Sequence, residues 1–182
     1  MKSNIFTVAL IVTAFFTCGC LSFVKAQKVI STLAAEIHPS QKMTLNTTIN
    51  WYLHLKNDLV SDDSKQAASA GTQLRTALID LSKQLTGDRR KDAYLAVLRS
   101  AAQKSGQIAD SKDDIKQQRV YFNRLSEDIY RLVKAFGTSK PLYKDYCPMV
   151  KASWLSEVED IKNPYMGSRM PTCGSVKEVL GK

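Results

Sequence analysis

Five sulfur-bearing residues near the C-terminus are the side chains of this sequence best suited to binding a metal ion. They are Cys147, Met149, Met166, Met170 and Cys173. Thiolate and thioether sulfur are soft ligands that favour Cu(I), and by the same logic Ag(I), over hard cations. The spacing differs from that of a zinc ribbon, because each half of the segment has one cysteine and no CxxC pair. The residue types therefore predict a soft-metal site.

The sequence between these sulfurs predicts a short helical turn. Asn163 followed by Pro164 is typical of an N-cap with proline at the first helical position. A turn that starts there places Met166 and Met170 four residues apart, on one face. Pro171 disfavours helical geometry at the residue before it, so the turn should end at Met170.

A disulfide between Cys147 and Cys173 is the main alternative for the same two cysteines. An oxidising compartment favours such a bond, and only these two of the four cysteines remain after removal of residues 1–26. The bridge would close a loop of about 25 residues and stabilise the fold by about 3 kcal/mol in the chain-entropy description. The methionines would then be core filler. Free inert thiols, or a reversible bridge that opens to bind metal, are further alternatives.

The sequence offers no comparable pattern for catalysis, so we expect no enzyme activity. It lacks GxSxG, HExxH, P-loop and GxGxxG motifs. His54 lies among apolar residues of a helical pattern and His38 precedes a proline, so neither marks a general base for a cysteine nucleophile. The acidic pairs 62–63 and 113–114 are expected to be helix-start charges that interact with the helix dipole.

The N-terminus reads as a targeting segment. Lys2 precedes a nearly continuous apolar run over residues 5–18, which suits a signal peptide and is short for a membrane-spanning helix. Val24-Lys25-Ala26 has small or apolar residues at the cleavage positions, so we expect a signal peptide over residues 1–26. Acylation of Cys20, as in an outer-membrane lipoprotein, is the alternative. A retained anchor helix is a third reading. All three place the rest of the chain in the periplasm or outside the cell, and for a cleaved chain we expect membrane contact only if Cys20 is lipidated.

Apolar residues at steps of three and four predict four helices between residues 42 and 137. The first stripe runs from Leu45 to Val60, and polar residues 61–64 then break it and can cap a second helix. Residues 105–106 are expected to end the third helix, and Gly137 to cap the fourth. The expected fold is an all-α, antiparallel four-helix bundle over residues 42–137. A lead-in at 27–41 precedes it, and an irregular Cys/Met/Pro-rich segment at 138–182 packs on it.

The positive charge of the chain is spread along its length. The formal net charge is +9, and removal of residues 1–26 takes away two lysines and no acidic residue, which leaves +7. Because the basic residues do not form a run interleaved with aromatics, we expect a solvated surface and no nucleic-acid partner. In the fourth helix, Arg119, Arg124, Glu127, Asp128 and Arg131 are expected to face water.

Two groups of residues resemble a known family, the bacterial domain of unknown function 3347. The matching residues are Gln118-Arg119, Phe122 and Leu125-Ser126 in the fourth helix, and Tyr146-Cys147-Pro148-Met149, Trp154-Leu155, Asn163-Pro164-Tyr165, Gly167, Met170 and Cys173-Gly174 in the C-terminal segment. Relatives of this domain occur alone as exported proteins and fused to periplasmic adaptor subunits of copper and silver efflux systems. The resemblance implies a role in soft-metal handling, with a metal-efflux adaptor as the expected partner.

Overall fold

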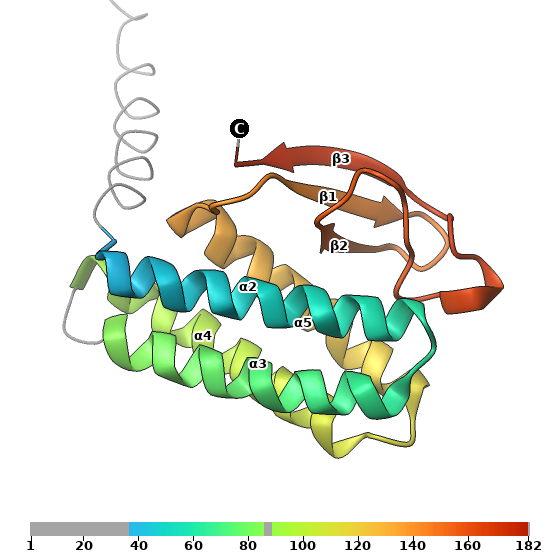
Figure 1. The fold of residues 1–182 in the computed structure, drawn as a ribbon, viewed down its shortest axis with the longest axis horizontal. Coiled ribbons are helices and arrows are strands. Elements are labelled where there is room, and N and C mark those ends of the chain that lie inside the picture. The colour runs from blue at the N-terminus through green and yellow to red at the C-terminus, as the bar shows by residue number, and fades with distance from the viewer. Residues whose placement is uncertain (1–36, 86–88, 182) are drawn as a thin grey trace, which may run out of the picture.

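The computed structural model of the chain describes residues 37–85 and 89–181 (Figure 1). The expected signal peptide at 1–26 and its alternative, acylation of Cys20, lie outside these residues. Most of the expected lead-in at 27–41 lies outside them as well. The first described helix begins at Pro39, within that lead-in.

Four long helices make up the first part of the described chain. They are α2 (Pro39–Val60), α3 (Ser64–Leu85), α4 (Arg89–Asp110) and α5 (Ile115–Phe136). Each packs against the next along the chain, and they lie side by side in a bundle (Figure 1). The predicted helical bundle is confirmed. Its interior is built from the apolar stripes, with leucines such as Leu59 and Leu74 fully buried.

Local hydrogen bonds explain where three of the helix ends lie. The Asp63 side chain accepts a hydrogen bond from the Gln66 N–H at 3.0 Å, which caps the start of α3. Asp114 does the same for the Gln117 N–H at 3.0 Å, at the start of α5. Gly137 ends α5 with φ of 79°, a conformation that favours glycine. The second aspartate of each predicted pair therefore caps a helix, and the glycine C-cap is confirmed, whereas Asp62 binds Arg119 and the Ser168 N–H instead.

The expected end of a helix at residues 105–106 is wrong, because α4 continues to Asp110. These small residues mark a close approach between helices. A Cβ on Gly71 of α3 would lie only 2.9 Å from the Ser105 carbonyl oxygen. Gly106 in turn packs against the Arg75 side chain, where a Cβ would be 3.4 Å away. Small side chains at 71, 105 and 106 allow α3 and α4 to pack closely.

The all-α fold class is also wrong, because a three-stranded antiparallel sheet follows the helices and makes the fold α+β. Its strands are β1 (Leu142–Cys147), β2 (Ala152–Ser156) and β3 (Ser175–Leu180), in the order β2-β1-β3. A 3-10 helix, η1 (Gly167–Arg169), lies between β2 and β3. The segment expected to be irregular therefore contains ordered strands, and Figure 1 shows the sheet above α2 and α5 with β2 nearest the helices.

Side-chain hydroxyl groups attach the edge strand β2 to the rest of the molecule. Tyr52 of α2 accepts a hydrogen bond from the Leu155 N–H at 3.0 Å and contacts the Ser126 hydroxyl of α5 at 2.8 Å. The Tyr165 hydroxyl donates to the Ser153 carbonyl at 2.8 Å. Unpaired backbone groups of an edge strand need partners when they are buried. These contacts supply partners for the Leu155 N–H and the Ser153 carbonyl, and they hold β2 against α2 and α5.

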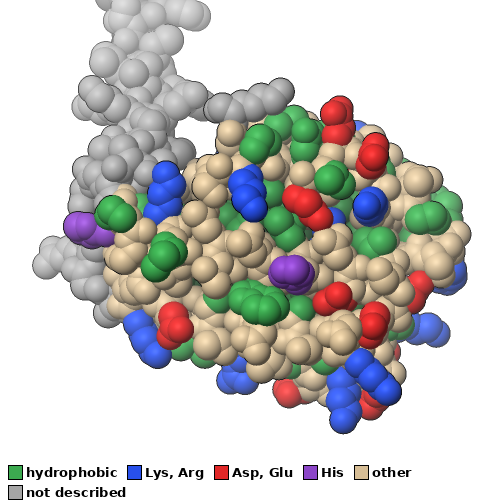
Figure 2. Space-filling model, viewed as in Figure 1, with side chains coloured by type: hydrophobic (Ala, Val, Ile, Leu, Met, Phe, Trp, Pro, Cys, Tyr) green, Lys and Arg blue, Asp and Glu red, His purple; other side chains and the backbone are tan. Residues whose placement is uncertain are grey.

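Two residues of α5 that were expected to face water are instead largely buried. The Arg119 side chain is 12% exposed, and Asp128 is 7% exposed and accepts a hydrogen bond from the Ser100 hydroxyl at 2.6 Å. On the face shown in Figure 2, lysine and arginine side chains are intermixed with acidic ones. None of the helices in the described residues has the length and apolar character that a membrane span requires.

Candidate metal centre

The strand topology brings Cys147 and Cys173 together. Cys147 is the last residue of β1, and Cys173 comes two residues before the start of β3. Because β1 and β3 are antiparallel neighbours, with Tyr146 opposite Ser175, the end of one strand lies beside the start of the other. The two Sγ atoms are 3.0 Å apart although 26 residues separate them along the chain. Both are free cysteines in the structure.

The two thiols differ in their exposure to solvent. Cys147 is fully buried, whereas Cys173 is partly exposed. Cys147 lies opposite buried Ala152 in the β1–β2 pairing, at the start of the turn that joins these strands. On the outer side, Cys173 is flanked by exposed Thr172 and Ser175. The pair therefore consists of one buried sulfur and one partly exposed sulfur.

Asn163 organises the loop that carries Cys173. Its side-chain nitrogen donates to the Cys173 carbonyl at 2.6 Å. Its side-chain oxygen accepts hydrogen bonds from the N–H groups of Tyr165 at 2.9 Å and Met166 at 3.1 Å. Asn163 is fully buried, and it caps the turn that begins at Pro164 as the sequence predicted. One amide side chain thus fixes the position of both ends of the loop.

The surroundings of the two sulfurs shift their pKa values in opposite directions. Burial raises the pKa of the Cys147 thiol, but hydrogen bonds from Cys173, from the backbone N–H groups of Val150 and Met149, and from Asn163 outweigh it and lower the pKa. The pKa of Cys173 is raised, because its thiol donates to Cys147 and its own ionisation would place a second negative charge beside the first. Of the two thiols, Cys147 is therefore the more easily ionised.

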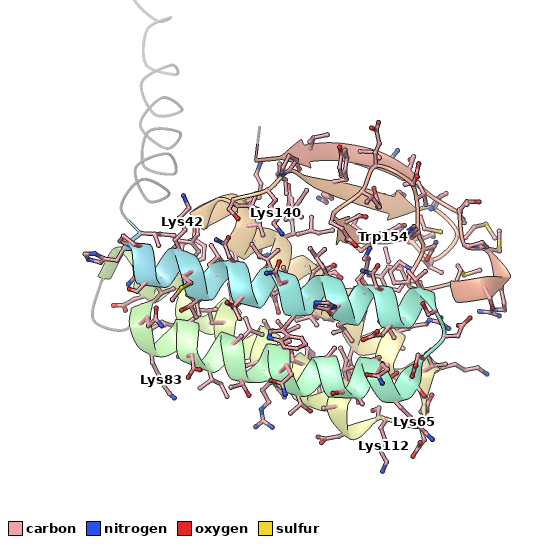
Figure 3. The ribbon with its side chains drawn as sticks, in the orientation of Figure 1. Lys42, Lys65, Lys83, Lys112, Lys140 and Trp154 are labelled. Carbon is pink, nitrogen blue, oxygen red and sulfur yellow. The ribbon has the colours of Figure 1, made fainter. Side chains whose placement is uncertain are left out.

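The three predicted methionine ligands lie close along the chain to the cysteines and reach the surface. Met149 is 66% exposed in the β1–β2 turn, and Met170 is 40% exposed. Met166 is partly exposed. The Met170 carbonyl accepts a hydrogen bond from the Cys173 N–H at 3.3 Å, so Met170 and Cys173 share one tight turn. The interpretation of Met149 and Met170 as core filler therefore does not fit. Figure 3 shows sulfur atoms near this end of the sheet.

An aromatic wall supports the loop from inside. Trp154 of β2, labelled in Figure 3, is 1% exposed. Its ring packs edge-on against Tyr165, with ring centroids 5.9 Å apart. The Tyr165 ring also packs against the Phe122 ring of α5, with ring centroids 5.6 Å apart. Gly174, next to Cys173, lies against Trp154, so a Cβ there would be 3.0 Å from the indole ring. This packing holds the Cys173 loop against the helices and shields the inner side of the sulfur pair.

The donor atoms fit a soft ion of low coordination number better than zinc. Within residues 37–85 and 89–181, no group of three or more His, Cys, Asp or Glu side chains is arranged to hold a metal ion. Structural zinc sites normally use four such ligands. Two adjacent cysteine sulfurs, with methionines two and three residues away along the chain, are residue types that suit Cu(I) or Ag(I). Both ions are larger than a proton. Binding either ion between the two Sγ atoms would therefore require these atoms to move apart.

The sequence patterns missed several polar residues near this site. Lys56 has a fully buried side chain on α2, where it forms a 2.9 Å ion pair with Glu157. Asp145 lies two residues before Cys147 on the same face of β1 and is fully buried. Burial raises the pKa of Asp145 to about 7, against an opposing effect of Lys56. In the sequence, only Lys56 indicated such a residue, because it is a lysine at a position of the apolar stripe between leucines.

Comparison with known proteins identifies a family. Residues 48–141 match a family model described as Protein of unknown function (DUF3347). This match covers just over half of the chain and agrees with the resemblance seen in α5. It ends before β1, so the sulfur-bearing segment follows the matched region. Searches of curated proteins and of solved structures found no match.

Proposed function

Because the chain belongs to the DUF3347 family, whose description assigns no activity, we infer the function from the site. We propose that this is an exported protein that captures a soft metal ion, of the Cu(I) or Ag(I) type, on Cys147 and Cys173. It buffers the ion in the cell envelope or passes it on. The process is exchange of sulfur ligands around the ion and involves no catalysis.

One observation carries this proposal: the sulfurs of Cys147 and Cys173 lie 3.0 Å apart. Metal ions bind the thiolate form of cysteine, and the lowered pKa of Cys147 makes that form easier to reach. The buried position of Cys147 excludes water from one side of the ion. Cys173 leaves the other side open for entry and release.

The surface methionines suit a role in transfer. Thioethers are weak, neutral ligands for soft ions. Met149 and Met170 are exposed next to the two cysteines, where they can hold an ion briefly on its way in or out. We propose a periplasmic or secreted location and a metal-efflux adaptor as the receiving partner. Both rest on the apolar N-terminal segment and on the family resemblance in the sequence.

Titration with Cu(I) under reducing conditions tests the proposal. A colorimetric Cu(I) chelator competes with the wild-type protein and with the Cys147→Ser and Cys173→Ser variants. Loss of a group that only orients a metal ligand costs about 10- to 100-fold in affinity. Loss of a ligand should cost more, so each serine variant is expected to bind Cu(I) at least about 100-fold more weakly. Equal uptake by all three proteins would refute the proposal.

Methionine variants separate the proposed ligands from other exposed thioethers. Met149→Leu and Met170→Leu should weaken Cu(I) binding by a smaller factor than the cysteine variants, since a neutral thioether contributes less than a thiolate. Met43 is the matched control, because it is 68% exposed in the first turns of α2, away from the sulfur pair. Lys42 marks that end of the bundle in Figure 3. Met43→Leu should leave the affinity unchanged.

A structural disulfide is the second candidate, and the same short distance between sulfurs favours it. In that case the protein is an interaction or structural unit of the envelope whose C-terminal segment is locked. A thiol count on native, unreduced protein distinguishes the two. Two free thiols support metal capture, whereas none shows a disulfide, which is structural only if a reducing glutathione buffer leaves it intact under native conditions.

A further inference from the structure

The two sulfurs of the site differ in a way that matters for covalent chemistry. Cys147 has no surface exposed to solvent, and Cys173 is partly exposed beside Thr172 and Ser175. If the pair is joined by a disulfide, an external thiol can reach only the Cys173 sulfur. In thiol–disulfide exchange, the sulfur that is attacked and the sulfur that leaves are different atoms. Access therefore assigns attack to Cys173 and departure to Cys147.

The surroundings of Cys147 suit a leaving sulfur. Cys147 ends β1, and the turn that follows it carries the backbone N–H groups of Met149 and Val150. These groups and the Asn163 side chain lower the pKa of the Cys147 thiol. The N–H groups belong to the β1–β2 turn, and Asn163 is held by its bonds to Tyr165 and Met166. These donors are already in place to stabilise the negative charge that reaches Cys147 when the bond breaks.

The geometry points to a redox function of the pair: Cys147 and Cys173 form a disulfide that exchanges reversibly with external thiols through Cys173, and this exchange opens and closes the metal site. The partner is a small-molecule or protein thiol. Control of the metal site rests on the proposed function, whereas the exchange itself does not.

The reductive direction proceeds in two steps. An external thiolate attacks the Cys173 sulfur, a mixed disulfide forms, the bond to Cys147 breaks, and its electron pair stays on Cys147 as a thiolate. A second external thiolate then attacks the external sulfur of the mixed disulfide and releases Cys173. The external thiols are oxidised to their disulfide, and the protein gains two electrons and, from solvent, up to two protons. The released dithiol is the form that binds a soft ion.

The oxidative direction is the reverse and needs an external disulfide as oxidant. The Cys173 thiol loses its proton to solvent, and the resulting thiolate attacks that disulfide and releases one external thiolate. Cys147, 3.0 Å away, then attacks the Cys173 sulfur and releases the second. Because Cys147 is buried, it reaches only the adjacent Cys173 sulfur. This restricts the mixed disulfide to a single position, which a measurement can locate.

Glutathione provides the test on full-length mature protein. Reduced wild type is treated with oxidised glutathione, and the closed form is returned to a glutathione redox buffer. We expect closure, and then reopening in reducing buffer under native conditions, where a structural disulfide would stay closed. Acid quenching during reopening, followed by peptide mass spectrometry, should find glutathione on Cys173 and not on Cys147.

Single-cysteine variants give an independent readout. Cys147→Ser leaves the exposed thiol and should form a stable mixed disulfide with glutathione. Cys173→Ser leaves the buried thiol and should react at least about 10-fold more slowly in the folded state, since reactivity depends on access. Circular dichroism verifies that both are folded, and equal rates after denaturation show that the difference comes from the fold.

Three results would overturn the inference. The first is glutathione attached to Cys147, and the second is failure of the wild type to form the Cys147–Cys173 disulfide. The third is a disulfide that reduced glutathione breaks only after the protein is unfolded. Cu(I) titration of the reduced and closed forms separates this inference from the proposed function. Cu(I) uptake by reduced protein with an inert disulfide defeats the inference alone. Exchange at Cys173 without Cu(I) uptake by reduced protein defeats the proposed function and leaves the exchange standing.

Discussion

Asp62 is the residue through which the helices hold the loop before β3. It ends the α2–α3 turn with φ of 58°, and its carboxylate accepts from the Arg119 guanidinium at 2.6 Å and from the Ser168 N–H at 2.9 Å. Arg119 also donates to the carbonyls of Leu59 and Pro164. Gly167, with φ of 54°, lies against both charged groups, so a Cβ there would overlap them. A side chain at 167 would therefore disrupt the junction that positions the loop.

This junction predicts a dependence of stability on acid. The Ser168 N–H and then the Arg119 guanidinium lower the pKa of Asp62 to about 2, below its value of about 3.9 in an unfolded chain. Ionised Asp62 therefore stabilises the fold fully above about pH 4, and this contribution disappears as pH falls through about 2. Because the Asp62 side chain is 36% exposed, solvent screening limits the effect to about 1 kcal/mol.

Asp62→Asn measures that contribution. Denaturant unfolding at pH 7 should show the variant less stable than wild type by about 1 kcal/mol, and the gap should narrow between pH 4 and pH 2. Asp113→Asn is the control, because Asp113 is exposed on the α4–α5 turn and forms no hydrogen bond or ion pair among the described residues. A gap that stays constant down to pH 2 would mean that the junction does not stabilise the fold through this charge.

Tyr52 joins three secondary-structure elements. Its ring stacks on Phe122 of α5, with centroids 5.3 Å apart, and its hydroxyl contacts Ser126 and the Leu155 N–H of β2. Lys56, one helical turn further along α2, adds the ion pair to Glu157 just after β2. The same face of α2 therefore binds the sheet by ring packing, by hydrogen bonds and by a buried charge. It sets where β2 lies, and β2 in turn sets where β1 presents Cys147.

Tyr52→Phe should weaken this attachment without emptying the core. The variant keeps the ring but leaves the buried Leu155 N–H without its acceptor, which should lower the free energy of unfolding by about 1–3 kcal/mol. Amide hydrogen exchange should accelerate at Leu155 more than at residues in the middle of α3. Tyr121→Phe on α5 is the control, because the Tyr121 hydroxyl makes no hydrogen bond among the described residues. Unchanged exchange at Leu155 would show that the hydroxyl does not hold β2.

At the scale of the whole molecule, the sequence predicted the helices well because their apolar stripes are regular. The sheet was missed because its strands are short and carry a weak pattern. β1 buries Asp145 in its centre, and Leu180 is the only buried residue of β3. Likewise, the helix periodicity predicted that Arg119 faces water, because periodicity carries no information about a contact with a distant loop. A buried polar residue gives no apolar signal, so such positions depend on tertiary contacts.

The candidate site was predictable in its residue types and not in its geometry. Sulfur chemistry alone singled out Cys147 and Cys173, and the Asn163-Pro164 cap was readable because capping is local. The approach of the two sulfurs depends on β1 pairing with β3, a long-range contact that periodicity does not encode. The control exerted by Asn163 over Cys173 likewise needs the loop to fold back.

The helices and the sheet share one core, which predicts a single cooperative unfolding transition even though the family match ends at residue 141. Trp154 and Leu155 of β2 pack in the same cluster as Phe122 and Leu59. Trp51→Phe removes the helical tryptophan and leaves Trp154 as the only indole in the described residues. Its fluorescence then reports on the sheet, while circular dichroism at 222 nm reports on the helices. The two probes should give the same denaturation midpoint, as expected for a two-state domain. A fluorescence transition at clearly lower denaturant would mean that the sheet, and with it the cysteine pair, unfolds independently while the bundle stays intact.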